Sequence, residues 1–140
     1  MTTALRVLFA ALVGFALALV IISGMEVLGQ QLFPAPPGLN PATPDGFRAI
    51  LAAMPPLAWG WLLLGYALAS LVGAWLAVLL AGRHMAGAWV LTALLTAAGI
   101  GNLLLLPHPA WFWFASLPVY PIFGFAGGRL IARRRRVDLF

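Results

Sequence analysis

The chain has 140 residues, of which 64% are hydrophobic and only 8% are charged, and its formal net charge is +5. A water-soluble domain of this size needs many more charged side chains to cover its surface, so the composition excludes a soluble globular protein. The absence of cysteine excludes a disulfide framework and a thiolate metal site. The length favours one domain, over residues 1–140.

Four uncharged stretches follow one another, over residues 7–25, 55–82, 85–106 and 110–128. A helix rises 1.5 Å per residue, so about 20 apolar residues cross a hydrocarbon core of roughly 30 Å. None of the stretches alternates apolar and polar residues as a membrane strand does. We therefore predict an all-α, integral membrane four-helix bundle, with spans at about 6–28, 57–81, 86–106 and 111–131. A cleaved signal peptide is the alternative for the first stretch, but its apolar run is unusually long for one.

The placement of arginine predicts the orientation of these spans. Seven of the eight arginines lie before the first span, between the second and third, or after the fourth. These regions share one side of the membrane when the number of spans is even, and only Arg48 lies on the other side. We expect both termini in the cytoplasm and a multi-pass protein of the bacterial inner (cytoplasmic) membrane.

A basic run directly follows the fourth span and consists of Arg133, Arg134, Arg135 and Arg136. A nucleic-acid patch is one interpretation of such a run. Anchoring to anionic lipid headgroups is the usual role of arginines beside a span. We therefore expect the lipid bilayer as a partner, and no nucleic acid.

The connection between the first two spans contains a proline-rich outer loop, over residues 34–44. Proline makes such a segment stiff and extended. Thr43 can cap a short helix over residues 45–54, with Pro44 at its first position. The apolar side chains of that segment share one face, namely Phe47, Ile50, Leu51 and Met54. We expect a short interfacial helix there, and an irregular loop is the alternative.

Small residues recur at every fourth position of the second span, at Gly65, Ala69, Gly73 and Ala77. Such a stripe lets another helix approach closely. Shorter stripes lie in the first span, at Ala10, Gly14 and Ala18, and in the third, at Ala93, Ala97 and Gly101. We expect these stripes to let the four helices form a compact bundle, and we expect the stripe of the second span to be an interface, within the chain or between chains.

Four tryptophans lie at the outer ends of the second and fourth spans, namely Trp59, Trp61, Trp111 and Trp113. Tryptophan rings are typical of the headgroup level of a membrane, so we expect these four to form an aromatic belt there. A ligand cage built from the same rings is the alternative interpretation.

The polar side chains of the spans gather toward their outer ends. Glu26 lies about 28 Å along the first span, near the edge of the hydrocarbon, and an ionisable group at this depth indicates function by default. We predict that Glu26, Tyr66, Asn102 and His108 converge on one pocket, with Trp111 as a further candidate ligand-binding residue.

Three roles are open for this pocket. Glu26 and Asn102 could hydrogen-bond the polar head of a lipid, quinone or pigment whose tail the helices bury. Glu26 could instead hold and exchange a proton, with His108 as its partner. Alternatively, Glu26 pairs with His108 or a backbone amide and fixes the proline-rich loop.

The sequence shows no evident cofactor motif and no catalytic constellation. The two histidines, His84 and His108, fall on opposite sides of the predicted membrane, which excludes a bis-histidine haem within one chain. One histidine beside one glutamate is too small a set for zinc. We therefore predict no metal site and no catalytic residue.

Several short motifs are distributed over most of the chain. Glu26 closes the first span, Pro55 opens the segment before the second, and Gly65 and Gly73 lie in the stripe. The longer motifs are Phe33-Pro34-Ala35-Pro36-Pro37-Gly38-Leu39, and Asn102 followed by Pro107-His108-Pro109 and Trp111. In these motifs the chain resembles a group of small bacterial four-span inner-membrane proteins that has no established activity. The resemblance implies a shared architecture and a site on the outer side. At Tyr66 the chain departs from the group, which has a histidine there, and this departure argues further against a metal.

The sequence favours a non-enzymatic accessory or stabilising subunit of a larger membrane complex, because the chain is small and its helix faces are rich in alanine and glycine. The partners would be other membrane-protein subunits or further copies of the chain. A second hypothesis is a periplasmic-side binder or carrier of a lipid, quinone or pigment. A third is a proton-coupled transporter or membrane enzyme that acts as an oligomer.

The predicted orientation can be tested with a topology reporter. A reporter enzyme fused after His84, in the turn between the second and third spans, should be active on the cytoplasmic side, because Arg83 marks that turn as inside. Activity of the same fusion outside the cell would overturn the orientation.

Overall fold

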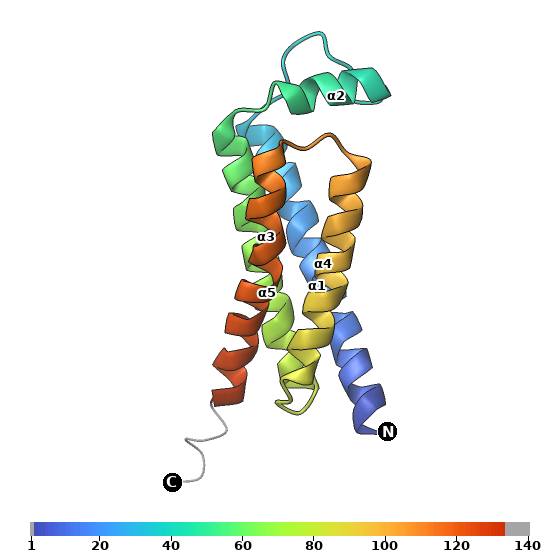
Figure 1. Ribbon diagram of the computed structural model, residues 1–140, viewed down its shortest axis with the longest axis vertical. Coiled ribbons are helices and arrows are strands. Elements are labelled where there is room, and N and C mark those ends of the chain that lie inside the picture. Colours follow the sequence, from blue (N-terminus) through green and yellow to red (C-terminus); the bar gives the residue numbers. More distant parts are fainter. Residues whose placement is uncertain (1, 134–140) are drawn as a thin grey trace.

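The computed structural model describes residues 2–133, and these residues form helices with no strand among them (Figure 1). The helices are α1 (Thr3–Leu32), α2 (Pro44–Ala52), α3 (Pro56–Leu80), α4 (Ala86–Leu105) and α5 (Ala110–Ala132). The four long helices are apolar enough to cross a membrane. The predicted all-α class and the four long apolar helices of a multi-pass membrane protein are thereby confirmed. Of the basic run, Arg133 is the C-cap residue that follows α5, and Arg134, Arg135 and Arg136 lie outside the described residues.

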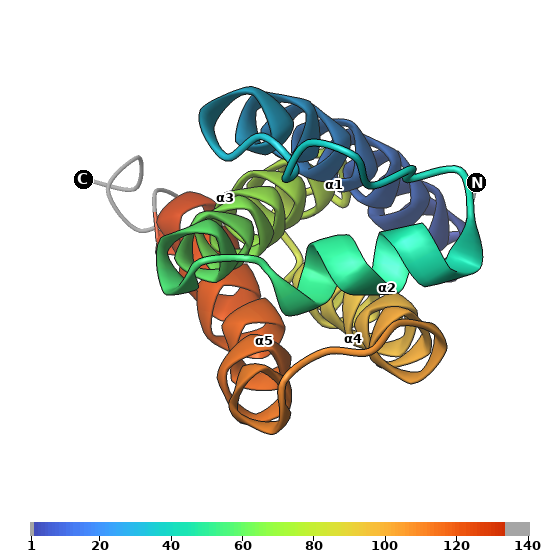
Figure 2. The same ribbon diagram turned by 90° about the horizontal axis from the view of Figure 1, so that it is seen from above.

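The four long helices run alternately up and down, and α2 lies across one end of the bundle (Figures 1 and 2). We call the half of the bundle beneath α2 the α2 half. The other half, in which α1 begins and α5 ends, is the terminal half. Helices α3 and α4 each pack against the other three long helices, and α3 makes the most extensive contacts, with α1 and α5.

The turn from α3 to α4 uses a residue that can adopt positive φ. Gly82 has φ +72°, and the backbone N–H groups of Gly82 and Arg83 donate to the carbonyls of Leu79 and Val78. This pair of hydrogen bonds is the Schellman motif, which is common at helix C-termini. The Arg6 Nε of α1 donates to the Leu80 carbonyl over 2.9 Å, which places a cation at the negative end of the α3 dipole.

The crossing of α1 over α3 depends on two facing glycines. A Cβ atom on Gly14 would lie 2.5 Å from the carbonyl oxygen of Gly73, and a Cβ on Gly73 would lie 2.8 Å from the carbonyl oxygen of Gly14. Ala10, Ala18, Ala69 and Ala77 are fully buried around this crossing. The stripes of the first and second spans thus meet each other.

The other crossings of the terminal half are equally close. A Cβ on Gly87 of α4 would lie 2.8 Å from the Ala77 carbonyl oxygen, and one on Gly127 of α5 would overlap the Leu71 carbonyl. Backbones that approach this closely leave no room for a cavity, so the terminal half is the tightly packed part of the bundle.

The stripe of the third span does not pack inside the chain, and this expectation was wrong. Ala93 and Ala97 are exposed on the outer face of α4, and a Cβ on Gly101 would meet nothing within 4 Å. Helix α4 instead buries the face that carries Leu91, Leu95 and Gly99, because the leucines fill more of the space between the helices than alanine can.

The α1–α3 crossing can be tested with two equivalent substitutions on one helix. We expect Gly14→Ala to lower the free energy of unfolding by about 1–3 kcal/mol, since the new Cβ meets a backbone carbonyl that cannot move freely. Gly24→Ala is the matched control, because a Cβ there meets nothing within 4 Å. Thermal unfolding in mild detergent measures both, and equal stabilities for the two variants would contradict the crossing.

Candidate functional site

The α2 half of the bundle encloses a cavity of about 640 Å³. Its walls come from α1, α3, the end of α4, the proline-rich segment and the underside of α2. The chemically distinctive residues of the wall are Glu26, Gln30, Tyr66, Asn102 and His108, and most of the remaining wall is apolar or aromatic.

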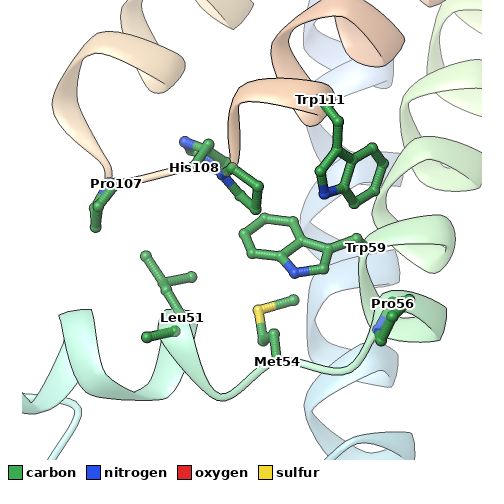
Figure 3. Close-up of a pocket in the computed structure, with 9 residues that line it drawn as sticks. Leu51, Met54, Pro56, Trp59, Pro107, His108 and Trp111 are labelled. Carbon is green, nitrogen blue, oxygen red and sulfur yellow. The ribbon is translucent and has the colours of Figure 1, made fainter.

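Four of the five residues that the sequence singled out therefore lie in one cavity. Glu26, Tyr66, Asn102 and His108 come from α1, α3, α4 and the α4–α5 connection. The fifth, Trp111, lines a neighbouring recess of about 460 Å³ on the α5 side (Figure 3). Trp111 is 48% exposed, because its side chain leaves α5 on the face turned away from the cavity.

Glu26 shares one face of α1 with two further wall residues, Gly29 and Gln30, at the helical spacing of three and four. Trp61 of α3 fixes this part of α1, since its indole N–H donates to the Met25 carbonyl over 2.8 Å. Gly29 makes room for the indole, as a Cβ there would lie 3.0 Å from the Trp61 ring. The carboxylate position is thus set by a contact between α1 and α3.

Trp59 is buried inside the bundle and does not face outward as a ring of an exposed aromatic belt would. It is only 4% exposed and packs against His108 and Phe112, with ring centroids 5.6 and 4.9 Å away. His108 stacks on Phe112 at 5.3 Å, with 9° between the planes. Trp59 and His108 line the recess (Figure 3) and also the cavity. Together with Leu51 and Met54, which line both as well, they separate the two.

The aromatic contacts continue into the middle of the bundle. Tyr66 packs against Phe112 and Tyr120, with ring centroids 6.2 and 5.6 Å away. Tyr120 lies against Gly99 of α4, where a side chain would overlap its ring. The sequence reasoning missed Phe112 and Tyr120. The sequence indicates them by the four-residue spacing of Phe112, Ser116 and Tyr120, which places these three residues on one face of the fourth span.

Helix α2 covers the cavity with its apolar side. Phe47, Ile50, Leu51 and Met54 line the cavity, whereas Asp45 and Arg48 are exposed on the opposite face. None of the nine residues of α2 is buried. The cover is therefore held by the tips of a few apolar side chains.

The predicted start of this helix is confirmed, because the Thr43 hydroxyl accepts from the Gly46 N–H over 3.1 Å and Pro44 occupies the first turn. The helix ends at Ala52 instead of residue 54. Met54 precedes Pro55, and a residue before proline is disfavoured in the α conformation.

The cavity is chemically asymmetric. Within the described part of the chain, Glu26 is the only aspartate, glutamate or arginine of its wall, and no group of three or more metal-ligating side chains exists. Asn102 and Gln30 offer amides and Tyr66 offers a hydroxyl. These polar groups can fix the head of a small molecule, and the aromatic wall can bury its apolar part.

Comparison of the chain with protein-family models, with curated proteins and with solved structures gives no match in any of the three.

Proposed function

We propose that this membrane protein binds a small amphiphilic molecule in the cavity beneath α2, of the class of a lipid, quinone or pigment. The observation that carries the proposal is a largely apolar cavity of about 640 Å³ onto which four helical and loop segments direct polar groups. Ligand sites commonly enclose about 300–1,000 Å³ and combine an apolar lining with a few convergent polar groups. The head would lie at Glu26, Tyr66, Asn102 and His108.

The cavity would open toward the periplasm of a bacterial inner membrane. In support, Arg6, Arg83, Arg129 and Arg133 all belong to the opposite end, at the start of α1, the α3–α4 turn and the end of α5. Only Arg48 accompanies α2. An excess of arginine marks the cytoplasmic side, so the ligand would be exchanged on the outer side.

The proposal predicts that the purified protein retains its amphiphile. After extraction in mild detergent, mass spectrometry of the organic extract should find a bound small molecule. Asn102→Leu should lower its amount about tenfold, since one lost hydrogen bond to a buried head is worth up to about 1.5 kcal/mol.

The matched control is Gln31→Leu, the same loss of an amide at an exposed residue outside the wall. It should leave the amount of bound molecule unchanged. An empty wild-type protein, or equal retention in both variants, would refute the proposal.

A second candidate function rests on the outer face of α4. Ala93 and Ala97 are exposed there in line with Gly101, and such a stripe allows another transmembrane helix to approach closely. We propose that the chain also associates through this stripe with further copies of itself or with other subunits, as an accessory component of a larger membrane assembly.

Native mass measurement in gentle detergent tests this association. The wild-type chain should travel in a complex larger than one copy, and Ala97→Leu should release the single chain because its side chain fills the stripe. Ala98→Leu is the control, since Ala98 is also exposed but lies off the stripe. A wild-type protein found only as a monomer would contradict the second candidate.

A further inference from the structure

Resting on the proposed function, we infer that the molecule bound beneath α2 is an organic cation, an amine or quaternary cation with an apolar body. The inference narrows the class of amphiphile. Two features of the cavity lead to it, namely its single carboxylate without an arginine partner in the wall and its aromatic residues.

The charge of the cavity wall is one-sided. Glu26 contributes a carboxylate, and no arginine within residues 2–133 lines the cavity. The closest charged residues along the covering helix, Asp45 and Arg48, lie on its exposed outer face. Glu26 lies at the exposed α1 edge of the cavity, so a bound group beside it would meet a carboxylate that has no arginine as a counter-charge in the wall. A cationic ligand would supply that charge, and an anionic ligand would add a second negative one.

The wall also offers the groups that bind cations without carrying charge. These uncharged aromatic residues of the cavity are Phe33, Phe47, Trp59, Trp61 and Tyr66. A cation within about 6 Å of an aromatic face is attracted by the ring, most strongly by tryptophan.

Trp61 cannot use its N–H to recognise an acceptor on the ligand, because that N–H already donates to the Met25 carbonyl. It therefore offers the ligand its ring alone. The combination selects for cations and against anions by repulsion from Glu26.

The test compares probes of similar shape and different charge. Tetraphenylphosphonium is the cation, tetraphenylborate the anion and triphenylphosphine oxide the neutral molecule. Each is titrated into protein held in phosphatidylcholine nanodiscs, with empty nanodiscs subtracted, and binding is followed by the fluorescence of the cavity tryptophans. We expect the cation to bind at least about tenfold more tightly than the neutral probe, and the anion not to bind.

Three variants test whether the preference for the cation depends on the Glu26 carboxylate. Glu26→Gln should reduce the affinity for the cation to that for the neutral probe. Glu26→Asp should keep the preference, because it keeps the charge. Asp45→Asn is the control, since it removes a carboxylate from the outer face of α2 and should change nothing.

The outcomes separate the inference from the proposed function. Equal binding of cation and neutral probe, or an unchanged preference in Glu26→Gln, would overturn the inference and leave the proposed site intact. The charge of the amphiphile that the wild-type protein retains tests the inference independently. A neutral or anionic molecule would also overturn it. Failure of every probe to bind, together with an empty purified protein, would remove both.

Discussion

The rest of the structure depends on the contact between the backbones of α1 and α3 at Gly14 and Gly73. Neither position has room for a Cβ atom, so the two helix backbones are in direct contact there. Lipid provides no hydrophobic drive between helices, and dispersion contacts between close backbones take its place. At Gly87 and Gly127, the backbones of α4 and α5 contact the backbone of α3 in the same way. Together they make the terminal half a dense support.

The α2 half is built from larger side chains. Trp59, Tyr66, Phe112 and Tyr120 lie between the helices there, and bulky rings hold helix axes farther apart than glycine does. The aromatic residues pack well between α3 and α5 and leave the space toward α1 and α4 unfilled. That space is the cavity. A small covering helix suffices, because the dense half already holds the four long helices together.

The position of Glu26 follows from the same geometry. A charge in the middle of a bilayer is costly, whereas a charge near the end of a span is tolerated. Glu26 lies late in α1, where Trp61 ties the helix to α3 through the Met25 carbonyl. The exposed Glu26 carboxylate therefore lies at the α1 edge of the cavity, near the end of the span, where a polar molecule can be exchanged.

The sequence alone determined the all-α class, the four long apolar helices and the capped start of α2, because apolar length and local capping are properties of neighbouring residues. Its polar residues near the span ends also pointed to one pocket, and four of them line the same cavity. Only the tertiary structure decided that Trp59 is buried, that Trp111 lies outside the cavity, that Phe112 and Tyr120 pack against the cavity rings Trp59 and Tyr66, and that the stripe of α4 faces outward. The reason is physical. A helix that is apolar on every side carries no local signal for its rotation about its own axis, so that rotation is set by which side chains fit against the neighbouring helices.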